Sequence, residues 1–427
     1  MKRWIKNFDE LATTENRKLV LEIAEAGLSA INTEEVILNS IKLENDILVI
    51  KDQSFILSKF KRIKVVGFGK ASCEAAQALE KVLGDKINEG AVIGLHKVTC
   101  DYIETFAGTH PRPSEANIEA GKKIYEIIKD SKEDDLIIVL VSGGGSALLV
   151  SSEEECLQGQ NIYDNFLKTG KTINEMNNIR KHLSVLKGGG LAKIAYPATV
   201  IGLIFSDVPG DNFSEVASGA TYKDEATNAD VQKIINEYDL GKYELIETPK
   251  EDKYFEKVHN FILVSNKTAV EAMAKKVEEL GLEVNIVSTE LYDEVDSALK
   301  KIFEAQKENT VVLAAGEPKL VVTKKGGSGG RCLYMGLRAI KTKIVDENSV
   351  LIPLASDGMD NSDAAGAVID KNTLEKIEKL GIDVDDYLDR FDTYPVFQKS
   401  GDMILTGPTG ANVSDLMILL TKKPVPY

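Results

Sequence analysis

Two patterns of hydrophobic and polar positions succeed one another along most of the chain. Short apolar runs, such as Leu136-Ile-Ile-Val-Leu140, are typical of strands that are buried on both faces of a sheet. The segments between them, such as 115–130, carry apolar residues at helical spacing. Strands that alternate with helices form βαβ units, so the pattern predicts an α/β fold with a parallel sheet.

The expected elements form two blocks, which the polar and charged segment 221–252 separates. In the first block, strands are expected over 63–67, 91–95, 136–142 and 198–205, and helices over 19–32, 71–83, 115–130, 169–179 and 191–195. In the second block, strands are expected over 261–265, 283–288, 310–315 and 350–355, and helices over 268–280 and 297–308. We therefore expect an N-terminal domain over residues 1–250 and a C-terminal domain over residues 251–427.

The charge balance narrows the range of partners. The 427 residues include 52 Lys and Arg against 67 Asp and Glu, which gives a net charge of −15. This charge argues against binding to nucleic acid or to acidic membranes, and an anionic ligand would need a local basic pocket. We expect small-molecule ligands, and the sequence carries no signal for an oligomeric state.

Cysteine usage and the absence of targeting signals indicate a compartment. The four cysteines are scattered, without the spacing of a zinc site or a disulfide framework. The sequence shows no secretory signal and no apolar run of transmembrane length. We therefore expect a protein of the reducing cytoplasm.

A run of three glycines follows the strand expected at 136–142. Bare backbone N–H groups in Ser142-Gly143-Gly144-Gly145-Ser146 can close around an anion, while a crowded strand-to-helix turn is the structural alternative. A hydrolase nucleophile would need G-x-S-x-G, and the second glycine is missing after Ser146. The segment therefore favours a phosphate cradle.

A second glycine turn, Gly67-Phe-Gly69-Lys70, follows the strand expected at 63–67. It is neither a complete dinucleotide fingerprint nor a Walker A loop, because Lys64 stands where that loop needs a glycine. The turn still presents N–H groups and a cation at the start of a helix. A tight turn with a surface lysine remains the alternative.

Polar and basic residues gather in the segment 177–190, which includes Asn178, Arg180, His182 and the run Lys187-Gly188-Gly189-Gly190. It is the kind of local basic pocket that an acidic protein needs for an anion. The alternatives are a buried, satisfied His182 and a solvated helix face.

The second half of the chain also has a carboxylate after an expected strand and a glycine-rich segment beside a cation. Glu317 follows the strand expected at 310–315, and the sequence GGSGG directly precedes Arg331. This segment is either a flexible hairpin or a mobile loop that brings the planar guanidinium of Arg331 to a phosphoryl group.

Two aspartates, Asp207 and Asp357, follow expected strands, where α/β folds place catalytic and metal-binding groups. Capping and turn roles are the alternative, and we favour them for Asp211, Asp360 and Asp363.

Cations, close-approach glycines and strand-end carboxylates together suit phosphoryl transfer, where catalysis is mostly positioning and charge neutralisation.

Nine motifs between residues 67 and 420 resemble, in order, those of the class II glycerate kinases, the glycerate 2-kinase family whose C-terminal part is the MOFRL domain. They are GFGKAS, THPRPSEAN, VSGGGSALL, NNIRKHLSVLKGGGLA, SDVPGDNFSEVASGAT, AAGEP, GGSGGR, ASDGMDNSDAAGA and SGDMILTGPTGANVSDLMILL.

The resemblance implies ATP-dependent phosphorylation of D-glycerate at its 2-hydroxyl, giving 2-phosphoglycerate, with Mg²⁺. It implies a larger N-terminal Rossmann-like domain with a parallel sheet, a smaller C-terminal α/β domain, and a site in the cleft between them. Matched by motif, the catalytic residues are Lys70, Arg331, Asp357 and Asp207, the last two also metal ligands. The nucleotide-binding residues are Ser142, Gly143, Gly144, Gly145, Ser146, Lys187, Gly188, Gly189 and Glu317. The substrate-binding residues are Gly69, Asn178, Arg180 and His182.

Three segments depart from the family pattern. Ala217-Ser-Gly-Ala-Thr221 stands where Ala-Ser-Gly-Pro-Thr is usual. Cys332-Leu333-Tyr334 stands where Asn-Gln-Glu is usual, and Asp360-Asn361-Ser362-Asp363 is one residue shorter than the usual Asp-Gly-Pro-Thr-Asp. These changes keep open a kinase of a related small sugar acid and a catalytically silent nucleotide-binding protein. A hydroxypyruvate reductase is a third alternative, which Gly67-Phe-Gly69 alone supports.

Overall fold

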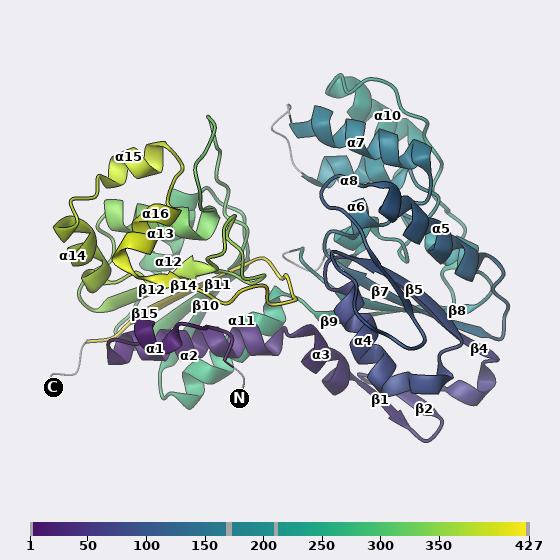
Figure 1. Ribbon diagram of the computed structural model, residues 1–427, viewed down its shortest axis with the longest axis horizontal. Helices are drawn as coiled ribbons and strands as arrows, with labels where there is room; N and C mark the ends of the chain where they lie inside the picture. The colour runs from purple at the N-terminus through teal and green to yellow at the C-terminus, as the bar shows by residue number, and fades with distance from the viewer. Residues whose placement is uncertain (1–2, 168–172, 209–211, 424–427) are drawn as a thin grey trace. The chain divides into compact units, whose positions relative to one another are not determined.

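The computed structural model describes residues 3–167, 173–208 and 212–423 of the chain and divides it into two compact units (Figure 1). One unit comprises residues 33–263, and the other comprises residues 1–32 together with 264–427. The sequence predicts a domain boundary after residue 250, with residues 1–32 in the N-terminal domain. In the structure they pack on the second unit, where the buried Arg17 pairs with Asp370 and Asp402.

The unit of residues 33–263 is built around a six-stranded sheet with the strand order β6-β5-β4-β7-β8-β9. The pairs from β6 to β8 are parallel. The chain starts at the centre with β4, moves outward through β5 and β6, then returns to β7 on the other side, which confirms the Rossmann-like fold. The strands are β4 (Arg62–Phe68), β5 (Glu89–Gly94), β6 (Glu104–Ala107), β7 (Asp135–Ser142), β8 (Thr199–Phe205) and β9 (Val258–Val264).

The central strand β7 is buried along its whole length, as its apolar sequence predicts, and apolar residues of α5 and α9 pack into the same core. The helices of this unit are α3 (Thr33–Ser40), α4 (Ser72–Leu83), α5 (Glu115–Lys129), α6 (Gly145–Leu148), α7 (Glu153–Leu167), α8 (Ile173–Lys181), α9 (Gly190–Ala195) and α10 (Asn228–Glu237), with 3-10 turns η1 (Leu57–Lys59), η2 (Gly84–Lys86), η3 (Phe213–Ser218) and η4 (Asp252–Tyr254). A separate antiparallel sheet contains β1 (Ile41–Glu44), β2 (Ile47–Ile50) and β3 (Gln53–Ile56).

The second unit has a mixed six-stranded sheet with the order β10-β11-β15-β12-β13-β14. The last strand, β15, lies antiparallel between β11 and β12, so the sheet is not the wholly parallel one that alternating strands and helices suggest. The strands are β10 (Glu283–Leu291), β11 (Thr310–Gly316), β12 (Ser349–Ala355), β13 (Gly366–Ala367), β14 (Met403–Ile404) and β15 (Asp415–Thr421).

Helix α2 of this unit packs closely on α11, because a Cβ atom at Gly27 would lie 2.9 Å from Cγ of Met273. The helices are α1 (Phe8–Leu11), α2 (Glu15–Ala30), α11 (Asn266–Glu279), α12 (Val295–Glu304), α13 (Arg331–Lys341), α14 (Lys371–Lys379), α15 (Val384–Asp389) and α16 (Tyr394–Ser400). Among the described residues, no helix combines the length and the apolar character that a membrane span requires.

Two expected elements lie differently in the structure. The strand expected at 261–265 is β9, which adds to the edge of the first sheet and does not open the second unit. The helix expected over 169–179 starts in 168–172, which lie outside the described residues, and its remainder belongs to α8.

Candidate active site

The strand order reverses between β4 and β7, so the carboxyl ends of these two strands are the expected ligand-binding position. The chain leaves these neighbouring strands toward opposite sides of the sheet, and ligands of open α/β sheets bind at such a point. The two loops that border it are joined by hydrogen bonds. The N–H group of Lys70 donates to the carbonyl of Gly143 at 2.8 Å, and that of Ala71 to the hydroxyl of Ser142 at 3.0 Å.

Glycines let these loops approach one another and the next strand. Gly69 and Gly144 have φ angles of 127° and 79°, which side chains rarely tolerate. A Cβ atom on Gly69 would lie 2.3 Å from the carbonyl oxygen of Ser142, and one on Gly143 would lie 2.0 Å from Oδ2 of Asp207. The missing side chains therefore let the carboxylate of Asp207, which follows β8, lie directly against the glycine loop.

The glycine loop after β7 keeps unused donors. In the described part of the chain, the N–H groups of Gly144, Gly145 and Ser146 have no hydrogen-bond acceptor. The hydroxyl of Ser146 lies 2.7 Å from that of Ser218. Successive free N–H groups in a left-handed turn can bind an anion, so this geometry suits the predicted phosphate cradle, which stays a prediction.

The second triple-glycine segment does not have this property. The N–H groups of Gly188 and Gly189 donate to the carbonyls of Ser218 and Gly219, each at 2.9 Å, and that of Gly190 donates to Lys187 at 2.9 Å. Because its donors are used within the fold, this loop is a closed turn. Its predicted role in phosphate binding through backbone N–H groups is not supported by this geometry.

Two cations and a histidine surround the open loop. A Cβ atom on Gly144 would lie 3.0 Å from Cγ of Lys70 and 3.3 Å from Nε2 of His110, so both side chains lie against this glycine. Desolvation of the ring and the positive charges of Lys70 and Arg180 lower the pKa of His110 to about 4. His110 is therefore neutral at pH 7, and the site keeps two positive charges.

Neither cation has a carboxylate partner within residues 3–167, 173–208 and 212–423. Arg180 is only 9% exposed, and burial lowers its pKa to about 10. A buried charge without a counterion is costly, and the fold retains one here beside the free N–H groups of Gly144, Gly145 and Ser146. The arrangement therefore suits an anionic ligand.

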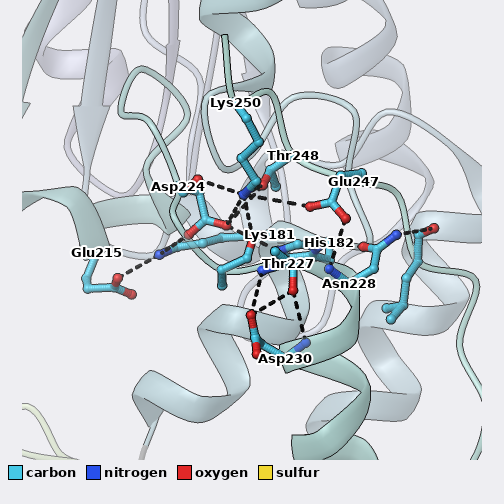
Figure 2. A network of polar contacts seen from close by, with 12 residues as sticks. Lys181, His182, Glu215, Asp224, Thr227, Asn228, Asp230, Glu247, Thr248 and Lys250 are labelled. Atoms are coloured by element: carbon cyan, nitrogen blue, oxygen red, sulfur yellow. Dashed lines mark hydrogen bonds and ion pairs between the residues drawn. The ribbon is translucent and has the colours of Figure 1, made fainter. Parts of the chain in front are cut away.

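Two predicted ligand-binding residues have structural partners instead. The buried ammonium group of Lys187 lies 2.5 Å from Oε1 of Glu155 and 2.6 Å from the carbonyl of Leu149. His182 is fully buried, with its ring nitrogens 3.1 Å from Asp224 and 2.7 Å from Asn228 (Figure 2). The polar groups of both side chains therefore have partners within the protein. The ligand-binding roles predicted for Lys187 and His182 are not supported by this geometry.

The second unit gathers charged residues at one sheet edge. Glu317 follows β11 and Asp357 follows β12, while Asp415 begins the antiparallel β15, paired with the last residues of both strands. Arg331, the first residue of α13, donates through Nε to Asp415 at 2.9 Å and lies 3.3 Å from Glu317. The structure thus brings three of the predicted residues to one edge.

Asp415 and Arg331 shift each other's pKa values. Burial raises the pKa of Asp415 to about 7, although Arg331 acts in the opposite direction. Asp415 and Glu317 raise the pKa of the Arg331 guanidinium against the effect of burial, so this arginine stays charged.

Asp357 has one described contact through its carboxylate, the N–H group of Met359 at 3.0 Å from Oδ1. By contrast, Asp360 accepts from the N–H groups of Gly330, Cys332 and Leu333 at the start of α13. Asp360 therefore has the capping role that we favoured for it.

The segment that departs from the family pattern after Arg331 faces the interior. Cys332 and Leu333 are buried, and Tyr334 stacks on Phe391 with the ring centroids 5.7 Å apart. These three side chains therefore serve packing.

Two residues of these clusters were not singled out from the sequence. His110 lies in the segment THPRPSEAN and Asp415 in SGDMILTGPTGANVSDLMILL, but neither has a local signal beyond its motif. His110 reaches the site by way of the loop between β6 and α5, and Asp415 by way of strand pairing that sequence spacing does not show.

Known proteins similar to this chain cover nearly all of it. A family model described as a domain of unknown function (DUF4147) matches residues 19–250, and the MOFRL family model matches residues 310–415. A glycerate 2-kinase from Pyrococcus horikoshii is 33% identical, over 95% of this chain and 97% of its own. A D-glycerate 2-kinase from Thermotoga maritima is 32% identical, over 94% of this chain and 97% of its own.

The chain also resembles a putative hydroxypyruvate reductase from Agrobacterium vitis, with 34% identity over 84% of this chain and 87% of that protein. Among solved structures, the crystal structure of a glycerate kinase from Thermotoga maritima matches with a TM-score of 0.82 and 30% identity. That match covers 95% of this chain and 99% of the other.

Proposed function

The chain belongs to the glycerate 2-kinase family, and from this premise we propose that it transfers the γ-phosphoryl group of ATP to the 2-hydroxyl of D-glycerate, giving 2-phosphoglycerate and ADP. The observation that carries the proposal is that, among the described residues, Lys70 and Arg180 have no carboxylate partner and lie beside N–H groups of the glycine loop that have no acceptor. Both substrates are anions, and the reaction needs negative charge to be neutralised.

In the first unit, Lys70 and the loop Gly144–Ser146 bind phosphoryl oxygens, and Arg180 provides a fixed positive charge. In the second unit, Arg331 has a planar guanidinium that pairs well with phosphate or carboxylate oxygens. Its contacts with Asp415 and Glu317 hold the side chain in place, which reduces the entropy lost when a ligand binds.

A strand-end carboxylate accepts the proton as the 2-hydroxyl oxygen attacks phosphorus and the bond to ADP breaks. Asp207 is the candidate in the first unit and Asp357 in the second. A loose transition state asks little of a base, so a carboxylate of ordinary basicity is sufficient. Single Asp→Asn variants at the two positions, compared by single-turnover rate, decide which carboxylate accepts the proton.

The carboxylates also fit Mg²⁺. This ion prefers oxygen ligands and is usually bound by one or two carboxylates together with substrate phosphates. In the described part of the chain no group of three or more His, Cys, Asp and Glu could hold a metal ion, so an all-protein cage is not what we propose. Asp207 in the first unit and Asp357 in the second are each a candidate ligand, and a bound ion would neutralise charge on the phosphates.

A hydroxypyruvate reductase is the second candidate, because some similar proteins carry that name and the strand order matches that of dinucleotide-binding sheets. In such folds the pyrophosphate binds to N–H groups of the first glycine turn. Here the N–H groups of Gly69, Lys70 and Ala71 donate to Ile93, Gly143 and Ser142 within the fold. This use of the donors favours the kinase.

A panel of small hydroxy acids with ATP and Mg²⁺ tests the function, with ADP release measured in a coupled assay and the phosphorylated carbon located by NMR. We expect D-glycerate to be the preferred acceptor and C2 the phosphorylated position. Oxidation of NADH on addition of hydroxypyruvate, without ADP release from any sugar acid, would instead establish the reductase.

The four free thiols are consistent with a reducing compartment, and we propose the cytoplasm.

A further inference from the structure

The unit of residues 33–263 contains a cavity of about 260 Å³ that the reaction proposed above does not yet use. It is lined by residues from α8, the closed glycine turn and the segment 214–226. Asn178 and Lys181 of α8 line it, whereas Arg180 of the same helix lines a smaller cavity with Ser146. Helix α8 therefore contributes both to the anion-binding region and to this larger cavity.

A polar network fixes the walls of the cavity (Figure 2). Asp224, 7% exposed, accepts from His182 and Thr248, both at 3.1 Å, and its backbone carbonyl accepts from Lys250 at 2.7 Å. These contacts join α8 to the segments 224–228 and 247–250. The cavity is therefore preformed, as ligand sites usually are.

The charges in the cavity argue against an anionic occupant. Lys181 lies 2.6 Å from Glu215 and 3.4 Å from Asp224, and Lys223 lies 2.7 Å from Asp252. Both lysines of the lining thus have carboxylate partners, and the lining itself holds three carboxylates against these two lysines. A phosphate or carboxylate ligand would meet no free cation among the described residues here, in contrast to the region around Lys70 and Arg180.

Neutral polar groups in the cavity lack partners. Within the described residues, neither the side-chain amide of Asn178 nor the hydroxyl of Tyr222 has a hydrogen-bond partner. An amide can both donate and accept, and an aromatic ring offers a flat apolar face. Carboxylates such as Glu225 accept readily from hydroxyl groups. These are the groups that recognise a base and a ribose.

We propose that this cavity binds the nucleoside part of the phosphoryl donor, with the phosphates directed toward Arg180 and Lys70. The inference rests on the proposed kinase function. The volume supports it, because whole ligands of drug size need about 300–1,000 Å³. A cavity of about 260 Å³ holds a base and part of the ribose and leaves the triphosphate outside.

The test is calorimetric titration of the full chain with ADP and, separately, with tripolyphosphate, which has the phosphates but no nucleoside. Asn178→Leu removes the amide and fills part of the cavity, and Tyr222→Phe removes only the hydroxyl. The matched control is Asn236→Leu, at an exposed position of α10 that does not line the cavity. Thermal unfolding of each variant checks that the fold is intact.

We expect Asn178→Leu to weaken ADP binding at least tenfold and Tyr222→Phe about threefold, with tripolyphosphate affinity changed less than twofold and the control like the wild type. ADP affinity that is unchanged in both variants would overturn the inference while the kinase function stands, as would a loss confined to tripolyphosphate or to the KM for D-glycerate. A wild type that binds neither probe would remove the kinase proposal and this inference together.

Discussion

Two adjacent residues of α8, Arg180 and Lys181, provide the sharpest test of the anion site. Both are buried cations, but Lys181 has carboxylate partners at 2.6 and 3.4 Å, whereas Arg180 has none in the described chain. Replacing each by Met keeps an unbranched apolar side chain of similar length. The stability of the protein should therefore change in opposite directions in the two variants.

The magnitude follows from the electrostatics. Burial lowers the pKa of Arg180 to about 10, which corresponds to about 3 kcal/mol of unfavourable free energy for the charged form. Arg180→Met removes this cost, so we expect the ligand-free unit to gain about 2 kcal/mol, or about 4–8 °C in Tm. Lys181→Met leaves Glu215 without its cation and removes the closer of two lysines from Asp224, which keeps Lys250 at 3.7 Å, so it should cost about 3 kcal/mol.

Differential scanning calorimetry of the full chain measures both changes. Fluorescence is unsuitable because the single tryptophan, Trp4, belongs to the other unit. The same substitution should raise stability and lower activity. Arg180→Met should lose at least about 100-fold in kcat/KM despite its higher Tm.

Inorganic phosphate provides a second measurement. At ten times its Kd it should stabilise the wild type by about 1.4 kcal/mol and the Arg180→Met variant by much less. A fall in Tm for Arg180→Met, comparable with that of Lys181→Met, would show that Arg180 has a structural counterion and would refute the assignment of an anion site.

Three further predictions concern other parts of the chain. Arg17→Met should lower the unfolding free energy of the second unit by about 3–5 kcal/mol, because Asp370 and Asp402 lose their buried partner. Urea unfolding followed by Trp4 fluorescence measures this change. A loss below about 1 kcal/mol would contradict the packing of residues 1–32 on that unit. The raised pKa of Asp415, about 7, means that its folded form binds a proton more tightly than its unfolded form. Its contribution to stability is therefore complete below the ordinary carboxyl pKa of 3.8 and is lost as the pH rises to about 7. Asp415→Asn should flatten this part of the stability profile, and an unchanged slope between about pH 5 and 7 would count against it. Gly143→Ala places a Cβ atom 2.0 Å from Oδ2 of Asp207, so the carboxylate must shift. The variant should lose about 100-fold in kcat with little change in Tm. Near-normal turnover in steady-state assays would remove Asp207 from the chemistry.

Local sequence patterns determined most elements of the first unit. The strands expected at 63–67, 91–95, 136–142 and 198–205 correspond to β4, β5, β7 and β8, because strands buried on both faces must be continuously apolar. The sequence also indicated an unusual backbone at the glycine run 143–145, since three consecutive glycines exceed what a turn requires, while its role in anion binding stays a prediction.

Long-range packing decided the rest. The segments KGGG and SGGGS look alike in sequence, but the N–H groups of the first are used by Ser218 and Gly219, residues about 30 positions away. Lys187 and Arg180 are both buried cations, and only the fold shows that Glu155 neutralises one of them. The membership of residues 1–32 in the second unit rests on contacts distant in sequence, such as the ion pair between Arg17 and Asp370 and the packing of Gly27 on Met273.

The chain by itself therefore determined which segments form strands and which motifs it shares with its family, because these depend on residues close in sequence. Tertiary structure decided which charged groups keep their charge free for a ligand. A counterion, a hydrogen-bond acceptor or a pairing strand can come from anywhere in the chain, and whether Arg180, His182 or Asp415 binds a ligand or supports the fold depends on that partner.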